Sequence, residues 1–126
     1  MIALGRSVRV FVRAEPTDMR KSFDTLGLLV REHIERDVTD GALYLFVGKD
    51  RRRAKVLFWD GTGMCVLSKR LEKGRFAAPW AKPRATSALE WTTSELALFL
   101  DGSELVGRFP LSPPAWRPEE RRVAFR

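Results

Sequence analysis

The spacing of apolar residues predicts a strand followed by a helix at the start of the chain. Residues 7–13 place three valines at alternate positions, which is the period of a strand with one buried face. Over residues 18–37, apolar side chains recur every three or four positions, as they do along one side of a helix. Thr17 suits the N-cap of that helix, because its hydroxyl can accept a hydrogen bond from a free backbone N–H.

The middle of the chain is predicted to hold consecutive strands joined by tight turns. Its apolar runs predict strands at residues 42–47, 54–59 and 64–67. Asp60-Gly61 predicts a hairpin turn, because glycine accepts the positive φ that such turns need. Lys73-Gly74 predicts a second hairpin that leads to Arg75-Phe76. We therefore expect residues 42–78 to form an antiparallel meander of three or four strands.

The last third of the chain is predicted to hold a loop, a short helix and a tail. Residues 79–88 contain two prolines and little pattern, as in a loop. Thr92 and Glu95 fit a capping box at the start of a short helix that ends at Asp101-Gly102. Residues 110–126 are rich in proline and arginine and are expected to form an extended or disordered tail.

Together these elements predict one α+β domain over residues 1–109. Its fold is expected to be an antiparallel β-meander of about four to five strands, packed on one face by one long helix, with a short C-terminal helix. The chain has 126 residues, which suits one domain with a real core. No apolar stretch reaches the roughly 18–20 residues that span a bilayer, and arginines interrupt the N-terminus. We therefore expect a cytoplasmic protein with no membrane partner.

The positive charge of the chain is concentrated in its middle third. The net charge is +7, but residues 1–48 balance, with seven Lys and Arg against seven Asp and Glu. Residues 49–84 hold eleven Lys and Arg against three Asp and Glu, whereas residues 85–126 hold five against six. Such clustering favours a phosphate-rich partner such as DNA. The alternative is a solvated surface that keeps the protein in solution.

Two clusters of cations make up this basic region, and the hairpin turn predicts that they meet. The predicted nucleic-acid-binding residues are Lys49, Arg51, Arg52, Arg53, Lys55, Lys69, Arg70, Lys73 and Arg75. Folding the chain at Asp60-Gly61 pairs Trp59 with a residue near Gly63 or Met64 and, six steps further out, Arg53 with Lys69 or Arg70. A separation beyond about 12 Å between the Cα atoms of Arg53 and Lys69 would place the clusters apart.

Three aromatic residues lie near the basic clusters in the sequence. Phe58, Trp59 and Phe76 could stack on unpaired bases, as aromatic side chains do in single-strand binding proteins. Aromatic residues in strands usually pack in the core instead, and we favour that interpretation.

The sequence predicts no catalytic residue, no metal site and no cofactor. His33 is the only histidine and Cys65 the only cysteine, so neither can head a cluster of metal ligands of its own type. Asp18, Asp24 and Asp60 could serve a two-metal nuclease only if they converged, and nothing in their spacing requires it. Asp18 suits a helix start and Asp60 a turn, which are structural roles.

Three segments of the chain resemble the signature blocks of a known family. They are TDMRKSFD at residues 17–24, WDGTGMC at 59–65 and KRLEKGRF at 69–76. The chain resembles the TnpB-type accessory protein, the product of the second open reading frame, of the IS-sixty-six class of bacterial insertion sequences. The resemblance covers roughly residues 5–101. It departs from the family at Ser22, where glycine is usual, and near Arg52, where an acidic residue is usual.

The resemblance implies a role in transposition beside a separate, larger transposase, and it carries over no catalytic residue. Our leading hypothesis is an accessory factor that binds DNA, at the element ends or the target, through its basic clusters. The alternative is a protein–protein adaptor that docks on the transposase or on another accessory protein. The Pro-rich tail with Trp116 favours this alternative.

Overall fold

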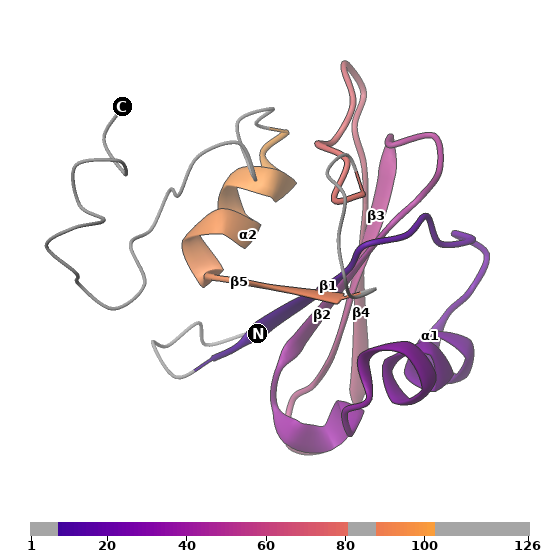
Figure 1. Ribbon diagram of the computed structural model, residues 1–126, viewed down its shortest axis with the longest axis vertical. Coiled ribbons are helices and arrows are strands. Elements are labelled where there is room, and N and C mark those ends of the chain that lie inside the picture. Colours follow the sequence, from indigo (N-terminus) through magenta and orange to yellow (C-terminus); the bar gives the residue numbers. More distant parts are fainter. Residues whose placement is uncertain (1–7, 81–87, 103–126) are drawn as a thin grey trace, which may run out of the picture.

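The computed structural model describes residues 8–80 and 88–102 and forms one five-stranded sheet with helices on both faces (Figure 1). The strands are β1 (Val10–Arg13), β2 (Leu43–Val47), β3 (Arg53–Trp59), β4 (Met64–Arg70) and β5 (Ala88–Trp91). The helices are α1 (Phe23–Leu29), which continues into a π-helical turn (Val30–Ile34), a 3-10 turn (Val38–Asp40) and α2 (Thr93–Leu100). The prediction of an α+β fold is confirmed.

The sheet is mixed, so the predicted antiparallel meander is wrong in part. The strand order is β4-β3-β2-β1-β5, and β1 pairs with β2 in parallel while all other neighbours are antiparallel. A parallel pair needs a crossover connection, which the helical segment between β1 and β2 provides. β5 was not predicted; it completes the sheet by pairing Val10 with Trp91. No strand forms at Arg75-Phe76, so the second predicted hairpin is also wrong.

Both faces of the sheet are covered, whereas the sequence predicted one covered face. On one face, α1 and its π-helical turn pack over Tyr44, Phe46 and Leu57. α2 lies on the other face (Figure 1). There, residues of α2 and Phe76 join a second apolar cluster. All five residues of β2 are buried, and such a continuous apolar run is typical of a strand packed on both sides.

The first helix is shorter than predicted, because residues 17–21 cross the end of β2 before it begins. Thr17 is not its N-cap: the backbone N–H of Thr17 donates to the carbonyl of Val47 at 2.9 Å. Ser22 is the N-cap, and Glu35, with a φ of 59°, follows the last helical turn. Met19 lies over Gly48, where a Cβ atom would come within 2.7 Å of Met19 Cγ.

The short C-terminal helix and its capping box are confirmed. The backbone N–H of Thr92 donates to Glu95 Oε1 at 2.9 Å, and that of Glu95 donates to Thr92 Oγ1 at 3.1 Å. The predicted tail, residues 110–126, lies outside the described residues, as do residues 103–109 of the predicted domain.

Candidate nucleic-acid interface

The register of the β3–β4 hairpin brings the two basic clusters to one end of the sheet. Trp59 pairs with Met64, and six steps outward Arg53 pairs with Arg70. Lys69 pairs with Ala54, the neighbour of Arg53. Paired strands lie about 4.7–4.9 Å apart, so the prediction that Arg53 and Lys69 lie close together is confirmed.

Backbone hydrogen bonds then hold the segment after β4 against the turn before β3. The N–H of Leu71 donates to the carbonyl of Arg52 at 2.8 Å, and the N–H of Phe76 donates to the carbonyl of Arg51. Arg51 Nε returns a bond to the carbonyl of Phe76 at 2.9 Å. Phe76 is fully buried and stacks on Phe99 with 4.7 Å between ring centroids, so its prediction as a core residue is confirmed.

We name this region the basic end, after the seven predicted cations that it gathers from two segments. They are Lys49, Arg51, Arg52, Arg53, Arg70, Lys73 and Arg75. Two carboxylates lie among them: Asp50 pairs with Arg53 at 3.1 Å and Glu72 with Arg70 at 3.6 Å. Both pairs are exposed to solvent, where an ion pair contributes little to stability.

Three of these cations are wholly available to a partner. Lys49, Lys73 and Arg75 are exposed, and within the described parts of the chain they form no ion pair or side-chain hydrogen bond. The carboxylate of Asp50 accepts a hydrogen bond from the backbone N–H of Arg52 at 3.0 Å, and this bond lowers the pKa of Asp50. The basic end therefore keeps a large excess of positive charge.

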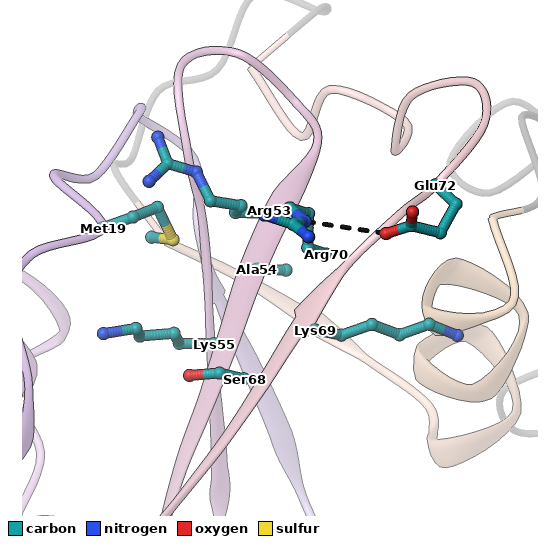
Figure 2. Close-up of a pocket in the computed structure, with 8 residues that line it drawn as sticks. All are labelled: Met19, Arg53, Ala54, Lys55, Ser68, Lys69, Arg70 and Glu72. Carbon is teal, nitrogen blue, oxygen red and sulfur yellow. Dashed lines mark ion pairs between the residues drawn. The ribbon is translucent and has the colours of Figure 1, made fainter.

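The remaining two predicted cations point to opposite faces of the hairpin. Lys55 Nζ donates to the carbonyl of Lys21 on the α1 side at 2.6 Å. Lys69 Nζ donates to the carbonyl of Leu100, in α2, at 2.6 Å. Figure 2 shows the two side chains extending in opposite directions from the paired strands. The nine predicted residues therefore share one end of the sheet but do not form one continuous surface, because neighbours along a strand alternate between faces.

A hollow of about 380 Å³ opens on the α1 face of this hairpin (Figure 2). Arg53, Lys55 and Arg70 line it together with Met19, Ser68 and Glu72. Neither Met19 nor Ser68 was predicted as a site residue, because no pattern in the sequence marks them. Counting the register outward from the turn would have found Ser68, which pairs with Lys55.

The opposite end of the hairpin is closed by Asp60. Its Oδ1 accepts the backbone N–H groups of Thr62 and Gly63, each at 2.9 Å, and Gly61 adopts a φ of 103°. These bonds lower the pKa of Asp60 to about 2, and the bond from Thr62 has the largest effect. The predicted turn role of Asp60 is confirmed.

The other residues considered for chemistry lie in ordinary surroundings. Asp18 does not stand at a helix start as predicted, because α1 begins at Phe23, and its carboxylate pairs with Arg20 at 2.8 Å on the surface. The pKa of the half-buried Cys65 thiol is raised mainly by burial and, to a smaller extent, by its 3.5 Å contact with Asp60. Over residues 8–80 and 88–102, no three His, Cys, Asp or Glu side chains gather as metal ligands. In the same residues, no helix is long and apolar enough to cross a membrane.

Comparison with known proteins agrees with the resemblance seen in the sequence. A family model described as "IS66 Orf2 like protein" matches residues 8–108. Two relatives from Sinorhizobium fredii, y4hO and y4jC, are 36% and 32% identical; the matches cover 94% and 90% of this chain and 96% and 97% of the relatives. No solved structure matches the chain. The chain belongs to the IS66 Orf2-like family, the accessory proteins of IS-sixty-six-class insertion sequences.

Proposed function

We propose that this protein is a non-catalytic accessory factor of insertion-sequence transposition that binds the DNA backbone through its basic end. The observation that carries the proposal is the register of β3 with β4, which sets Arg53 directly opposite Arg70. Like charges at paired positions destabilise a sheet, so the pairing is not explained by folding. A phosphate group between the two guanidinium groups would offset the repulsion.

The chemistry of the basic end suits phosphates better than base edges. An arginine fork can donate to two phosphate oxygens at once, and five of the seven cations of the basic end are arginines, namely Arg51, Arg52, Arg53, Arg70 and Arg75. Contacts of this kind position a protein on DNA without reading its sequence. The element ends and the target DNA, both handled during transposition, are the substrates that fit such a role.

An adaptor role, docking on the transposase or another accessory protein, is the second candidate. Its support in the sequence, the tail with Trp116, lies outside the described residues. The large apolar side chains that are exposed in the described residues are divided among α1, β4 and α2, as Phe23, Leu28, Leu67 and Leu98. Singly scattered apolar residues are normal on a protein surface. Clustered charge is therefore the stronger guide to the partner, and DNA remains first.

The test is DNA binding by the double variant Lys73→Gln, Arg75→Gln. Both residues are exposed, and neither has a described partner whose loss would disturb the fold. We expect wild-type affinity for random duplex to fall steeply with salt, because bound cations release counterions. The double variant should bind all sequences more weakly, with a salt slope smaller by about 2.

The matched control is Arg9→Gln, Arg31→Gln, which removes the same charge elsewhere. Arg9 is in an exposed pair with Glu90 near β5, and Arg31 is exposed in the π-helical turn. This control should lose much less affinity and keep the wild-type salt slope. Equal losses of affinity in the two double variants would show that DNA binding depends on the net charge of the protein and not on the basic end. Absence of DNA binding by the wild-type protein would move the adaptor role to first place.

A further inference from the structure

The hollow on the α1 face is built by residues from three separate segments. β3 contributes Arg53 and Lys55, and β4 contributes Arg70 and Ser68. The crossing segment before α1 contributes the buried Met19, which forms an apolar wall. Ala54 and Lys69 also line the hollow. Since the Ala54 side chain belongs to the core of the other face and Lys69 reaches α2, their backbone forms the floor.

The charges that line this hollow leave it strongly positive. Arg53, Lys55 and Arg70 line it from this face, against the single carboxylate of Glu72. Lys55 is fixed beside the hollow by its bond to the carbonyl of Lys21, and an ammonium group has two further protons to donate. No hydrogen-bond partner is described for the hydroxyl of Ser68, on the same face. Donors and a charge excess therefore converge on a space whose apolar lining residues are Met19 and Ala54.

We propose that the hollow binds the terminal phosphomonoester of a DNA strand. The inference rests on the proposed function and adds to it a specific site and ligand group. A phosphomonoester carries a charge of about −1.5 to −2 at neutral pH, as seen for phosphorylated side chains. That charge balances the excess on the α1 face of the lining, which is three cations less one carboxylate, because the fourth lining cation, Lys69, is directed to α2. A backbone diester, with a single negative charge, would leave part of the excess uncompensated.

The position of the carboxylates also favours a strand end over the middle of a strand. Glu72 lies at the edge of the hollow and Asp50 pairs with Arg53 beside it. An internal phosphate brings a neighbouring phosphate on each side, so one neighbour would approach a carboxylate and be repelled. A terminal phosphate has a neighbour on one side only and can enter with its strand directed away from Glu72.

The experiment compares one duplex sequence carrying a 5′-phosphate, a 3′-phosphate or hydroxyl groups at both ends. Binding of the full chain is measured by fluorescence anisotropy. We expect one phosphorylated duplex to bind about tenfold more tightly than the hydroxyl duplex, and the two phosphorylated duplexes identify which terminus is bound. Arg53→Gln and Arg70→Gln should each abolish this preference. At constant ionic strength, inorganic phosphate should compete with it while leaving binding of the hydroxyl duplex unchanged.

The control variant is Lys73→Gln, which belongs to the basic end but does not line the hollow. It should weaken binding of all three duplexes alike and retain the preference. Equal affinity of wild-type protein for the three duplexes would overturn the terminal-phosphate site, yet steep salt dependence in the same data would leave the proposed function intact. Equal loss of preference in Lys73→Gln would also overturn it. Thermal unfolding of each variant confirms that the fold is retained.

Discussion

The two ends of the β3–β4 hairpin differ in how their charged side chains interact with the backbone. At the turn, Asp60 accepts two backbone N–H bonds and its pKa falls to about 2, so its charge is used by the fold. At the basic end, Arg53 is opposite Arg70, and their partners are exposed carboxylates that contribute little. The charge of Asp60 therefore stabilises the local structure, whereas the charges of Arg53 and Arg70 remain exposed to solvent.

The difference separates charge that stabilises the fold from charge available to a ligand. A polar side chain that accepts several backbone hydrogen bonds has a structural role, because those bonds stabilise the fold. Cations placed opposite one another have no such role, because their repulsion lowers the stability of the fold. Within this hairpin, the position of a charged residue relative to the ladder therefore distinguishes a structural from a functional role better than its residue type.

The largest expected effect tests whether the core holds the basic end together. Phe76→Ala should lower the free energy of unfolding by about 3–5 kcal/mol, because it empties a fully buried site stacked on Phe99. Urea denaturation measures this change. The control is Phe23→Ala, at a side chain 47% exposed on α1, which should have a much smaller effect. Similar losses in the two variants would show that residues 71–76 are held by something other than Phe76.

A smaller, pH-dependent effect is expected at the turn. The folded pKa of Asp60, about 2, lies below the value of about 3.9 for a free aspartate. Its charge therefore stabilises the fold above about pH 4, and that contribution is lost as the pH falls toward 2. Asp60→Asn keeps the Oδ1 acceptor, so its Tm should lie slightly below the wild-type value at pH 7 and converge with it under acid conditions.

Asp60→Ala removes the acceptor and should lower the Tm at both pH values. The Asn variant should also support transposition in a cell assay, since the predicted role of Asp60 is confined to the turn. Thermal unfolding at pH 7 and pH 3 measures both variants. A Tm difference between wild type and Asp60→Asn that does not change with pH would contradict a structural role for the charge. Loss of transposition in a well-folded Asn variant would instead indicate a functional carboxylate.

The smallest expected effect concerns the opposed arginines. Arg53→Gln and Arg70→Gln each remove one cation of the pair and one exposed ion pair, two changes of opposite sign. Stability should therefore change by no more than about 0.5 kcal/mol, as at most surface positions. Chemical denaturation at low salt measures it. Marked destabilisation would mean that the arginines support the fold, and the contrast between the two ends of the hairpin would fail.

Local patterns in the sequence predicted the parts of the fold that depend on neighbours along the chain. The hairpin at Asp60-Gly61 and the capping box of Thr92 and Glu95 are set by residues within a few positions of each other. The parallel pairing of β1 with β2 and the pairing with β5 depend on contacts across long stretches of chain. A four-residue strand such as β5 has too little alternation to be seen without its partner.

The candidate site divides in the same way. Register counting from one turn predicted the meeting of Arg53 with the end of β4, because each step outward is fixed by the ladder. The helix start was misplaced, since Thr17 uses its backbone N–H to bond Val47 and only the folded structure shows that contact. For the same reason Met19, which lies in this crossing segment, was not predicted to line the hollow.

The place of β1 in the sheet, between β2 and the edge strand β5, also sets an order of events during synthesis. β1 finds its first neighbour once β2 has been made, but its second neighbour, β5, ends at Trp91. Arg9 and Glu90, which pair beside these strands, are 81 residues apart. At roughly 5–20 residues per second, β1 waits several seconds on the ribosome with one edge unpaired. A message cut before the codon for Ala88 would yield a chain in which β1 becomes an unprotected edge strand that is prone to aggregation.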